Sequence, residues 1–233
     1  MQYNYITQDI IREWRRELLL GDKPFIRIPN FVSEQFIEMI QQRWRTMSAQ
    51  GFAPFISNAN IQRTSPNYHL YVDNQFHGYY LFPWNAPVDE YTHHICLAVH
   101  QLRNKIEGHT DFHHIFPYEN RFVQFRVLRS LNGGMHVAQH ADFIASPPPK
   151  ALSKHVFDPN RIQATLLLSQ KHIDYTGEGF VFIVGEHVID PCADAKSGDL
   201  LLWRYTEQHA VREVYSHPSQ LGFLRIIFPV VDR

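Results

Sequence analysis

RFVQFRVL, residues 121–128, begins a series of short β-strand patterns in the second half of the chain. Side chains that alternate between apolar and polar with a two-residue period are typical of a strand with one buried face. Further short strand patterns follow, separated by glycine and proline: QATLLLS at 163–169, GFVFIV at 179–184, DLLLW at 199–203, HAVREV at 209–214 and FLRIIFPVV at 223–231. Successive strands without intervening helices predict an antiparallel sandwich or barrel.

The residues before this strand-rich half are predicted to be mainly helical. Residues 6–20, 33–47 and 87–106 carry apolar side chains at helical spacing. FIRI, residues 25–28, is predicted to form a short strand between the first two helices. Residues 51–85 hold many aromatic side chains among Asn, His and Gly and give no clear assignment.

The length of 233 residues predicts a single domain with one sizeable core. Because no flexible linker separates the helix-rich part from the strand-rich part, we interpret the change near residue 115 as a change of layer within that domain. Residues 1–119 are then a mixed helical lead-in, and residues 120–233 form the strand-rich core of the domain.

Composition and charge limit the classes of partner and compartment. A formal net charge of -1 shows no basic excess, which disfavours a nucleic-acid partner. Charged residues interrupt the first twenty positions, so no signal peptide or membrane span is predicted there. Cys96 and Cys192 are isolated thiols, which fit a reducing compartment. These features predict a soluble cytoplasmic protein without a membrane or nucleic-acid partner.

HVAQHAD, residues 136–142, contains the first candidate metal ligands. His140 and Asp142 are two positions apart, so both side chains leave the same face of an extended segment. This pair alone is weak in a chain with 15 histidines. His209, which opens a distant strand, completes a set of two histidines and one carboxylate. That set is expected of non-heme Fe(II) oxygenases and leaves three coordination positions open; zinc is the alternative metal.

Arg225 is the single cation in the apolar strand at 223–231. A guanidinium inside a barrel needs an anionic partner, and its planar fork matches a carboxylate. The alternative is an arginine whose stem packs on the sheet while its head reaches solvent at the outer face.

The combined pattern resembles the double-stranded β-helix of the Fe(II)/2-oxoglutarate dioxygenases. It comprises His-x-Asp, a distant histidine that opens a strand, and Gly-x-x-Arg on the last strand, within residues 120–231. GEGFVF at 177–182 resembles the glycine-rich entry to the family's fourth strand, and SGDLLLW at 197–203 resembles the turn before the strand that precedes the distal histidine. HAVREV is similar to the family's His-x-Val-x-x-Val.

The resemblance implies an α+β protein with a double-stranded β-helix (jelly roll) core and N-terminal helices packed on one sheet. It implies that residues 120–233 are the jelly-roll catalytic core and that residues 1–119, the helical lead-in, include segments that cover the substrate. It also implies that His140, Asp142 and His209 form the catalytic centre and bind Fe(II). Arg225 would hold the 5-carboxylate of 2-oxoglutarate, and O2 would be the second co-substrate.

Two departures from the family pattern leave the co-substrate contacts open. Many members have the arginine closer to the distal histidine, so Arg212 and Arg126 are rivals of Arg225. The hydroxyl that usually follows two residues after the arginine is absent, because Ile227 stands there. Gln124 and Thr165 are predicted from their strand positions to provide further co-substrate contacts.

The expected reaction is hydroxylation of an unactivated C–H bond in a small molecule, such as an amino acid or biosynthetic intermediate, with release of succinate and CO2. Desaturation and ring formation use the same protein ligands and stay open. The retained carboxylate of Asp142 disfavours halogenation, and Val231 stands where a nucleic-acid demethylase would have a second arginine. The alternatives are a protein or peptide side-chain hydroxylase of the same superfamily and a non-oxygenase cupin-like barrel that binds zinc or manganese.

Overall fold

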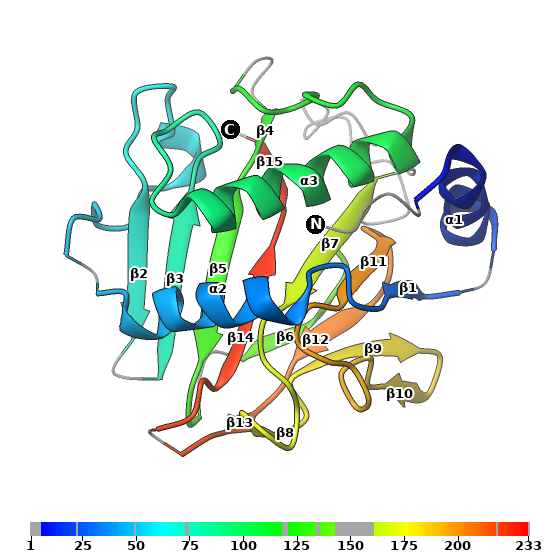
Figure 1. Cartoon of the computed structure of the whole chain (residues 1–233). Helices are drawn as coiled ribbons and strands as arrows, with labels where there is room; N and C mark the ends of the chain where they lie inside the picture. The colour runs from blue at the N-terminus through cyan, green and yellow to red at the C-terminus, as the bar shows by residue number, and fades with distance from the viewer. Residues whose placement is uncertain are drawn as a thin grey trace.

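Two antiparallel sheets face each other, and helices cover the outer face of the larger one (Figure 1). The computed structural model describes residues 6–21, 23–48, 50–72, 75–117, 121–133, 136–142, 161–217 and 219–232. The predicted α+β jelly-roll architecture with N-terminal helices on one sheet is therefore confirmed. The predicted boundary between residues 119 and 120 lies outside the described residues.

Three helices form where the apolar spacing predicts them: α1 (Gln8–Leu20), α2 (Glu34–Thr46) and α3 (Glu90–Glu107). Helix α3 begins three residues later than predicted from Pro87, because Asp89 is its N-cap and accepts a hydrogen bond from the Thr92 backbone N–H at 2.8 Å. Gly108 ends α3 in the left-handed conformation, with φ 87°, which favours glycine. None of the helices in the described ranges is long and apolar enough to cross a bilayer.

The larger sheet has seven strands in the order β1-β11-β7-β14-β5-β3-β2. Their bounds, in that order, are Phe25–Ile28, Leu200–Arg204, Ile162–Leu167, Phe223–Ile227, Phe125–Ser130, Phe76–Leu81 and Tyr68–Val72. β2 and β3 form an antiparallel hairpin within the stretch that the sequence left unassigned. Five of the six residues in β3 are buried, so this strand shows no two-residue alternation.

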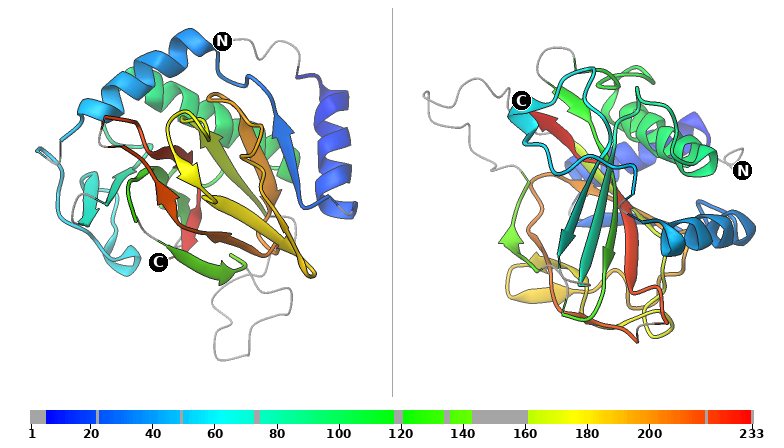
Figure 2. Two further views of the ribbon diagram at one scale, coloured as in Figure 1. Left: turned by 90° about the horizontal axis from the view of Figure 1, so that it is seen from below. Right: turned by 90° about the vertical axis from the view of Figure 1, so that its left-hand side faces the viewer.

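The smaller sheet has the order β10-β9-β12-β6 and lies on the other side of the larger sheet from α2 and α3 (Figures 1 and 2). Its strands, in that order, are His187–Ile189, Phe180–Val184, His209–Val211 and Val137–His140. Two further pairs complete the fold: β8 (Thr176–Gly177) with β13 (Val214–Tyr215), and β4 (Arg121–Val123) with β15 (Val230–Asp232). A short 3-10 helix, Asn58–Asn60, precedes β2.

Side chains of the larger sheet alternate between two hydrophobic cores. On β14, Leu224 and Ile226 belong to the core under the helices, together with Ile95 of α3. Phe223 belongs to the core between the two sheets. Because alternate side chains share one face of a strand, Arg225 points to the same side as Phe223, into the space between the sheets.

Candidate active site

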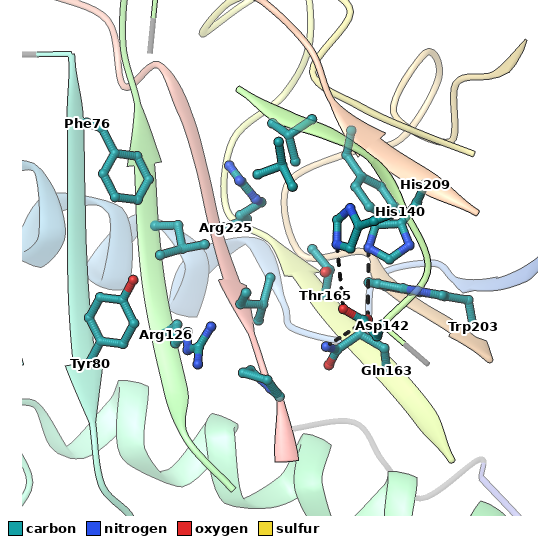
Figure 3. A pocket seen from close by; sticks show the side chains of 16 residues that line it. Phe76, Tyr80, Arg126, His140, Asp142, Gln163, Thr165, Trp203, His209 and Arg225 are labelled. Atoms are coloured by element: carbon teal, nitrogen blue, oxygen red, sulfur yellow. Dashed lines mark hydrogen bonds and ion pairs between the residues drawn. The ribbon is translucent and has the colours of Figure 1, made fainter. Parts of the chain in front are cut away.

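Three predicted metal ligands converge between the sheets (Figure 3). His140 ends β6 and His209 opens β12, and the two residues are direct partners in the antiparallel pairing of these strands. Their ring centroids are 4.4 Å apart. Asp142 lies two residues beyond the end of β6, with its carboxylate oxygens 3.7 Å from His140 Nε2 and 3.9 Å from His209 Nε2.

Hydrogen bonds to the backbone set the orientation of both imidazoles. Nδ1 of His140 lies 2.8 Å from the carbonyl oxygen of Ala138, and Nδ1 of His209 lies 2.9 Å from that of Glu207. A carbonyl can only accept, so Nδ1 carries the proton in each ring and donates it. Each Nε2 is then left with a lone pair directed toward Asp142, as a metal ligand requires.

The two imidazoles differ in exposure, and their pKa values shift in opposite directions. The His140 side chain is 38% exposed, and the Asp142 carboxylate that faces it raises its pKa. The His209 side chain is 7% exposed, and burial lowers its pKa, which favours the neutral form that binds metal. Gln163 Nε2 donates to Asp142 Oδ2 at 3.4 Å and so orients the carboxylate.

The donor set fits a divalent metal ion with open coordination positions. One ligand atom from each of the three residues lies within 4.8 Å of the others, and no further His, Cys, Asp or Glu in the described ranges joins the cluster. Two imidazole nitrogens and one carboxylate oxygen on one side of an ion suit Fe(II). Zinc accepts the same donors, so the ligands by themselves do not distinguish the two metals.

A cavity of about 220 Å³ lies beside the three ligands. Strands of both sheets contribute its walls, and Figure 3 shows Arg225 across the cavity from the histidines. The described lining residues are Phe76, Tyr80, Arg126, Leu128, Val137, His140, Asp142, Gln163, Thr165, Phe180, Trp203, His209, Val211, Arg225, Ile227 and Pro229.

Arg225 is 4% exposed and has no carboxylate partner among the described residues. Its guanidinium lies 4.2 Å from the centroid of the Phe223 ring, and one terminal nitrogen donates to Ser130 Oγ at a long 3.5 Å. Burial lowers the pKa of Arg225 to about 10, which leaves it cationic at neutral pH. A buried, charged and weakly satisfied guanidinium is suited to a carboxylate ligand.

The fold matches those of solved hydroxylases and oxygenases, among them an oxidoreductase of the 2OG-Fe(II) oxygenase family from Burkholderia pseudomallei. A Pseudomonas putida prolyl-4-hydroxylase is similar over 96% of this chain and 99% of its own, with a TM-score of 0.57 and 13% identity. The chain has the fold of the 2-oxoglutarate–Fe(II) oxygenases. Comparisons with protein-family models and with curated proteins give no match.

Two further structures with this fold are associated with different classes of molecule: one is in complex with a peptide fragment, and the other belongs to nogalamycin biosynthesis. A Trichoplax adhaerens prolyl hydroxylase, in complex with a hypoxia inducible factor oxygen degradation domain peptide fragment, covers 97% of this chain and 90% of its own, with a TM-score of 0.55 and 13% identity. The non-heme alpha ketoglutarate dependent epimerase SnoN from nogalamycin biosynthesis is similar over 97% of this chain and 82% of its own, with a TM-score of 0.51 and 11% identity.

The remaining predicted co-substrate residues fall into two groups. Thr165 and Arg126 line the cavity of the oxygenase fold. Gln124 is fully buried and lies outside the described lining of the cavity. Its side-chain amide donates a hydrogen bond to the Tyr68 hydroxyl and accepts one from Arg126. Arg212 lies away from the cavity and pairs with Glu178 at 2.5 Å, so its charge is already matched.

Sequence reasoning missed several residues that surround the candidate ligands. Gln163 is two positions before Thr165 on β7 and therefore shares its face, a signal that could have been used. Trp203 and Phe180 pack against His209, with ring centroids 5.7 and 5.5 Å away. Tyr80 lies on β3, within the stretch at 51–85 that has no clear assignment, so the sequence does not predict which face of a strand it occupies.

Proposed function

We propose that this protein is an Fe(II)- and 2-oxoglutarate-dependent oxygenase that hydroxylates an unactivated C–H bond of a small molecule. The reaction consumes O2 and 2-oxoglutarate and yields the alcohol, succinate and CO2. One observation carries this proposal: three metal-type donors and a buried arginine line the same cavity, and no carboxylate among the described residues pairs with that arginine. A zinc or manganese barrel without a carboxylated co-substrate gives no reason for that arginine.

His140, Asp142 and His209 would hold the iron. Bound iron would supply the oxidative chemistry with O2 and 2-oxoglutarate, while the protein positions the reactants and excludes water. Arg225 binds the 5-carboxylate of 2-oxoglutarate and so orients the co-substrate toward the metal side of the cavity. Gln163 holds the Asp142 carboxylate in place.

Apolar side chains limit water around the reacting groups. Trp203 and Phe180 cover one side of His209, and Phe76 lies on the opposite side of the cavity (Figure 3). A dry site strengthens the interaction between Arg225 and a carboxylate. It also limits side reactions of the oxidising species with solvent.

A protein or peptide side-chain hydroxylase is the second candidate. It is favoured by the similarity to two prolyl hydroxylases, one of them in complex with a peptide fragment. The small-molecule assignment is supported by the modest cavity of about 220 Å³ and by the likeness to SnoN, an epimerase from nogalamycin biosynthesis.

Turnover of 2-oxoglutarate to succinate tests the proposed chemistry. Purified protein with Fe(II) and O2 is expected to form succinate slowly without substrate, and pools of small molecules are expected to contain one that gains the mass of one oxygen. Asp142→Ala and His140→Ala should bind Fe(II) at least about a hundredfold more weakly in anaerobic titrations. His187→Ala, which changes an exposed histidine, is the matched control.

Two results would contradict the proposal. Wild-type Fe(II) affinity in both ligand variants would show that the metal does not bind there. Succinate formation at the same rate with zinc in place of iron would show that the activity does not depend on iron.

A further inference from the structure

Two arginines of the described residues line the cavity, but the 5-carboxylate of 2-oxoglutarate needs only one of them. Arg225 lies on β14 and Arg126 on the neighbouring β5, where the register pairs Arg225 with Leu128 and Ile227 with Arg126. Arg126 is two residues from Leu128 on β5 and therefore lies on the same face of the sheet as Arg225. The two arginines are offset by two residues along the strand direction, which is about 7 Å. Figure 3 shows the two guanidinium groups at separate places in the wall.

Neighbouring side chains hold Arg126 in a fixed orientation. Its Nε donates to Gln124 Oε1 at 2.6 Å, and Gln124 Nε2 donates to the Tyr68 hydroxyl at 2.9 Å. The guanidinium carbon lies 5.1 Å from the centroid of the Tyr80 ring. Tyr80 itself stacks on Tyr68, with centroids 4.5 Å apart. The side chain is thus positioned before any ligand arrives, which lowers the entropic cost of binding.

These contacts leave the terminal fork of Arg126 available. Its two terminal nitrogens have no hydrogen-bond partner among the described residues, and no described carboxylate pairs with it. The arginines Arg27, Arg204 and Arg212 each pair with a carboxylate, Asp194, Glu207 and Glu178 respectively. Arg126 differs from them because it faces a cavity and no acidic side chain in the described part of the chain pairs with it.

We infer that Arg126 binds a carboxylate of the substrate, so that the substrate is a small carboxylic acid oxidised elsewhere on its carbon chain. This inference rests on the proposed function, in which Arg225 is already occupied by the co-substrate. Arg225 is the more deeply buried of the two, and Arg126 is only partly buried in the wall, closer to solvent. Its planar fork matches a carboxylate in a bidentate manner.

Gln124 is then a positioning residue for the substrate. Its carbonyl oxygen accepts from Nε of Arg126, which directs the other edge of the guanidinium toward the cavity. Gln124 lies outside the described cavity lining, so in this proposal it acts through Arg126, whereas the sequence predicts a direct contact with 2-oxoglutarate.

The test uses a matched pair of probes of equal size, butanoate and butanamide. The protein is loaded with Mn(II), which replaces Fe(II) without turnover and is paramagnetic, and is saturated with 2-oxoglutarate. Proton relaxation of each probe then reports binding close to the metal. We expect butanoate to bind at least about tenfold more tightly than butanamide. Arg126→Gln should remove this preference, and Arg212→Gln, which changes a surface arginine, should retain it.

Binding of 2-oxoglutarate to the Mn(II)-loaded wild type is measured first, so that the two proposals fail separately. No 2-oxoglutarate binding would refute the proposed function and this inference together. Normal 2-oxoglutarate binding with equal affinity for butanoate and butanamide would refute this inference alone. Loss of 2-oxoglutarate binding in Arg126→Gln, with retention in Arg225→Gln, would reverse the two roles.

A second variant guards against misfolding of Arg126→Gln. Arg126→Lys keeps the positive charge but loses the fork, and we expect it to lower the preference for butanoate several-fold while 2-oxoglutarate binding is retained. A full wild-type preference in this variant would show that the fork does not contact the probe.

Discussion

Each candidate site residue is defined by the partner that it has or lacks. In both histidines Nδ1 donates a hydrogen bond to a backbone carbonyl, of Ala138 for His140 and of Glu207 for His209, so Nε2 remains free to coordinate a metal ion. Arg225 lies next to an aromatic ring and a distant hydroxyl, neither of which neutralises a charge. Metal and co-substrate would supply the missing partners of both sets.

Replacement of Arg225 separates the co-substrate assignment from its rivals. Arg225→Ala should weaken 2-oxoglutarate binding about tenfold to a hundredfold, because a buried charge-assisted pair is lost. Arg212→Ala should leave binding unchanged, since its side chain pairs with Glu178 outside the cavity. Calorimetric titration of the Mn(II)-loaded protein measures both. Unchanged binding in Arg225→Ala, or its loss in Arg212→Ala, would overturn the assignment.

Among the elements, the helices matter to the site because they cover the outer face of the strands that carry it. Side chains of α3 and of β14 share one core, on the opposite face from Arg225. Trp44 of α2 donates from Nε1 to Thr92 Oγ1 at 2.9 Å, and the Thr92 hydroxyl donates to Asp89 at 2.6 Å. The start of α3 is thus tied to α2.

The caps of α2 and α3 provide a matched comparison. Asp89→Ala should lower the free energy of unfolding by about 1 kcal/mol, because the side chain accepts from the Thr92 backbone N–H. Ser33→Ala should cost less than about 0.5 kcal/mol, since Ser33 caps α2 without a side-chain hydrogen bond. Urea unfolding measures both. An equal loss in the two variants would contradict the role given to Asp89.

Replacement of Ile95, a buried residue of α3, tests how tightly this helix packs, and the exposed Ile173 outside the helix is its control. Ile95 is 0% exposed, so Ile95→Ala should destabilise the protein by about 2–5 kcal/mol through lost burial and a new cavity. Ile173 is 61% exposed, so Ile173→Ala should change stability by less than about 1 kcal/mol. Chemical unfolding at constant pH compares them; a small effect of Ile95→Ala would show that α3 packs more loosely than described.

At the scale of the whole molecule, the site exists only when the two sheets are packed together. The smaller sheet carries the two histidines, and the larger sheet carries both arginines of the cavity. A ligand that bridges the sheets therefore binds the folded state and not the unfolded chain, and it stabilises the fold by mass action.

Thermal unfolding should show this coupling. Mn(II) with 2-oxoglutarate at about a hundredfold above its dissociation constant should raise the melting temperature by about 5–10 °C, from roughly 2.7 kcal/mol of linkage. Removal of the metal with EDTA should abolish the shift, and Asp142→Ala should show little of it. A shift of equal size with 2-oxoglutarate and no metal would indicate binding elsewhere.

Local pattern was sufficient for much of the fold. Helix α3 and the alternation within β5 (Phe125–Ser130) are confirmed because each is a periodicity that short-range geometry imposes. The predicted strands at 121–128, 209–214 and 223–231 each divide into two strands that belong to different sheets, which local pattern does not show. β2 and β3 were not predicted: most of β3 is buried and has no alternation, and its role depends on pairing with β5. The start of α3 was placed early because Pro87 suits a first turn, but the Asp89 cap decides it.

By itself the sequence determined the three helices, the strand at 25–28 and the main strand-forming segments after residue 121, and it identified His140, Asp142, His209 and Arg225 as residues whose chemistry suits one site. Only the tertiary structure decided that Arg212 lies outside the cavity, that Gln124 accepts a hydrogen bond from Arg126 and that Arg126 faces the cavity with no carboxylate partner among the described residues. The reason is physical: periodicity within a strand is a local property, whereas the partner of a charge is set by strands that are distant in sequence and meet only when the sheets pair.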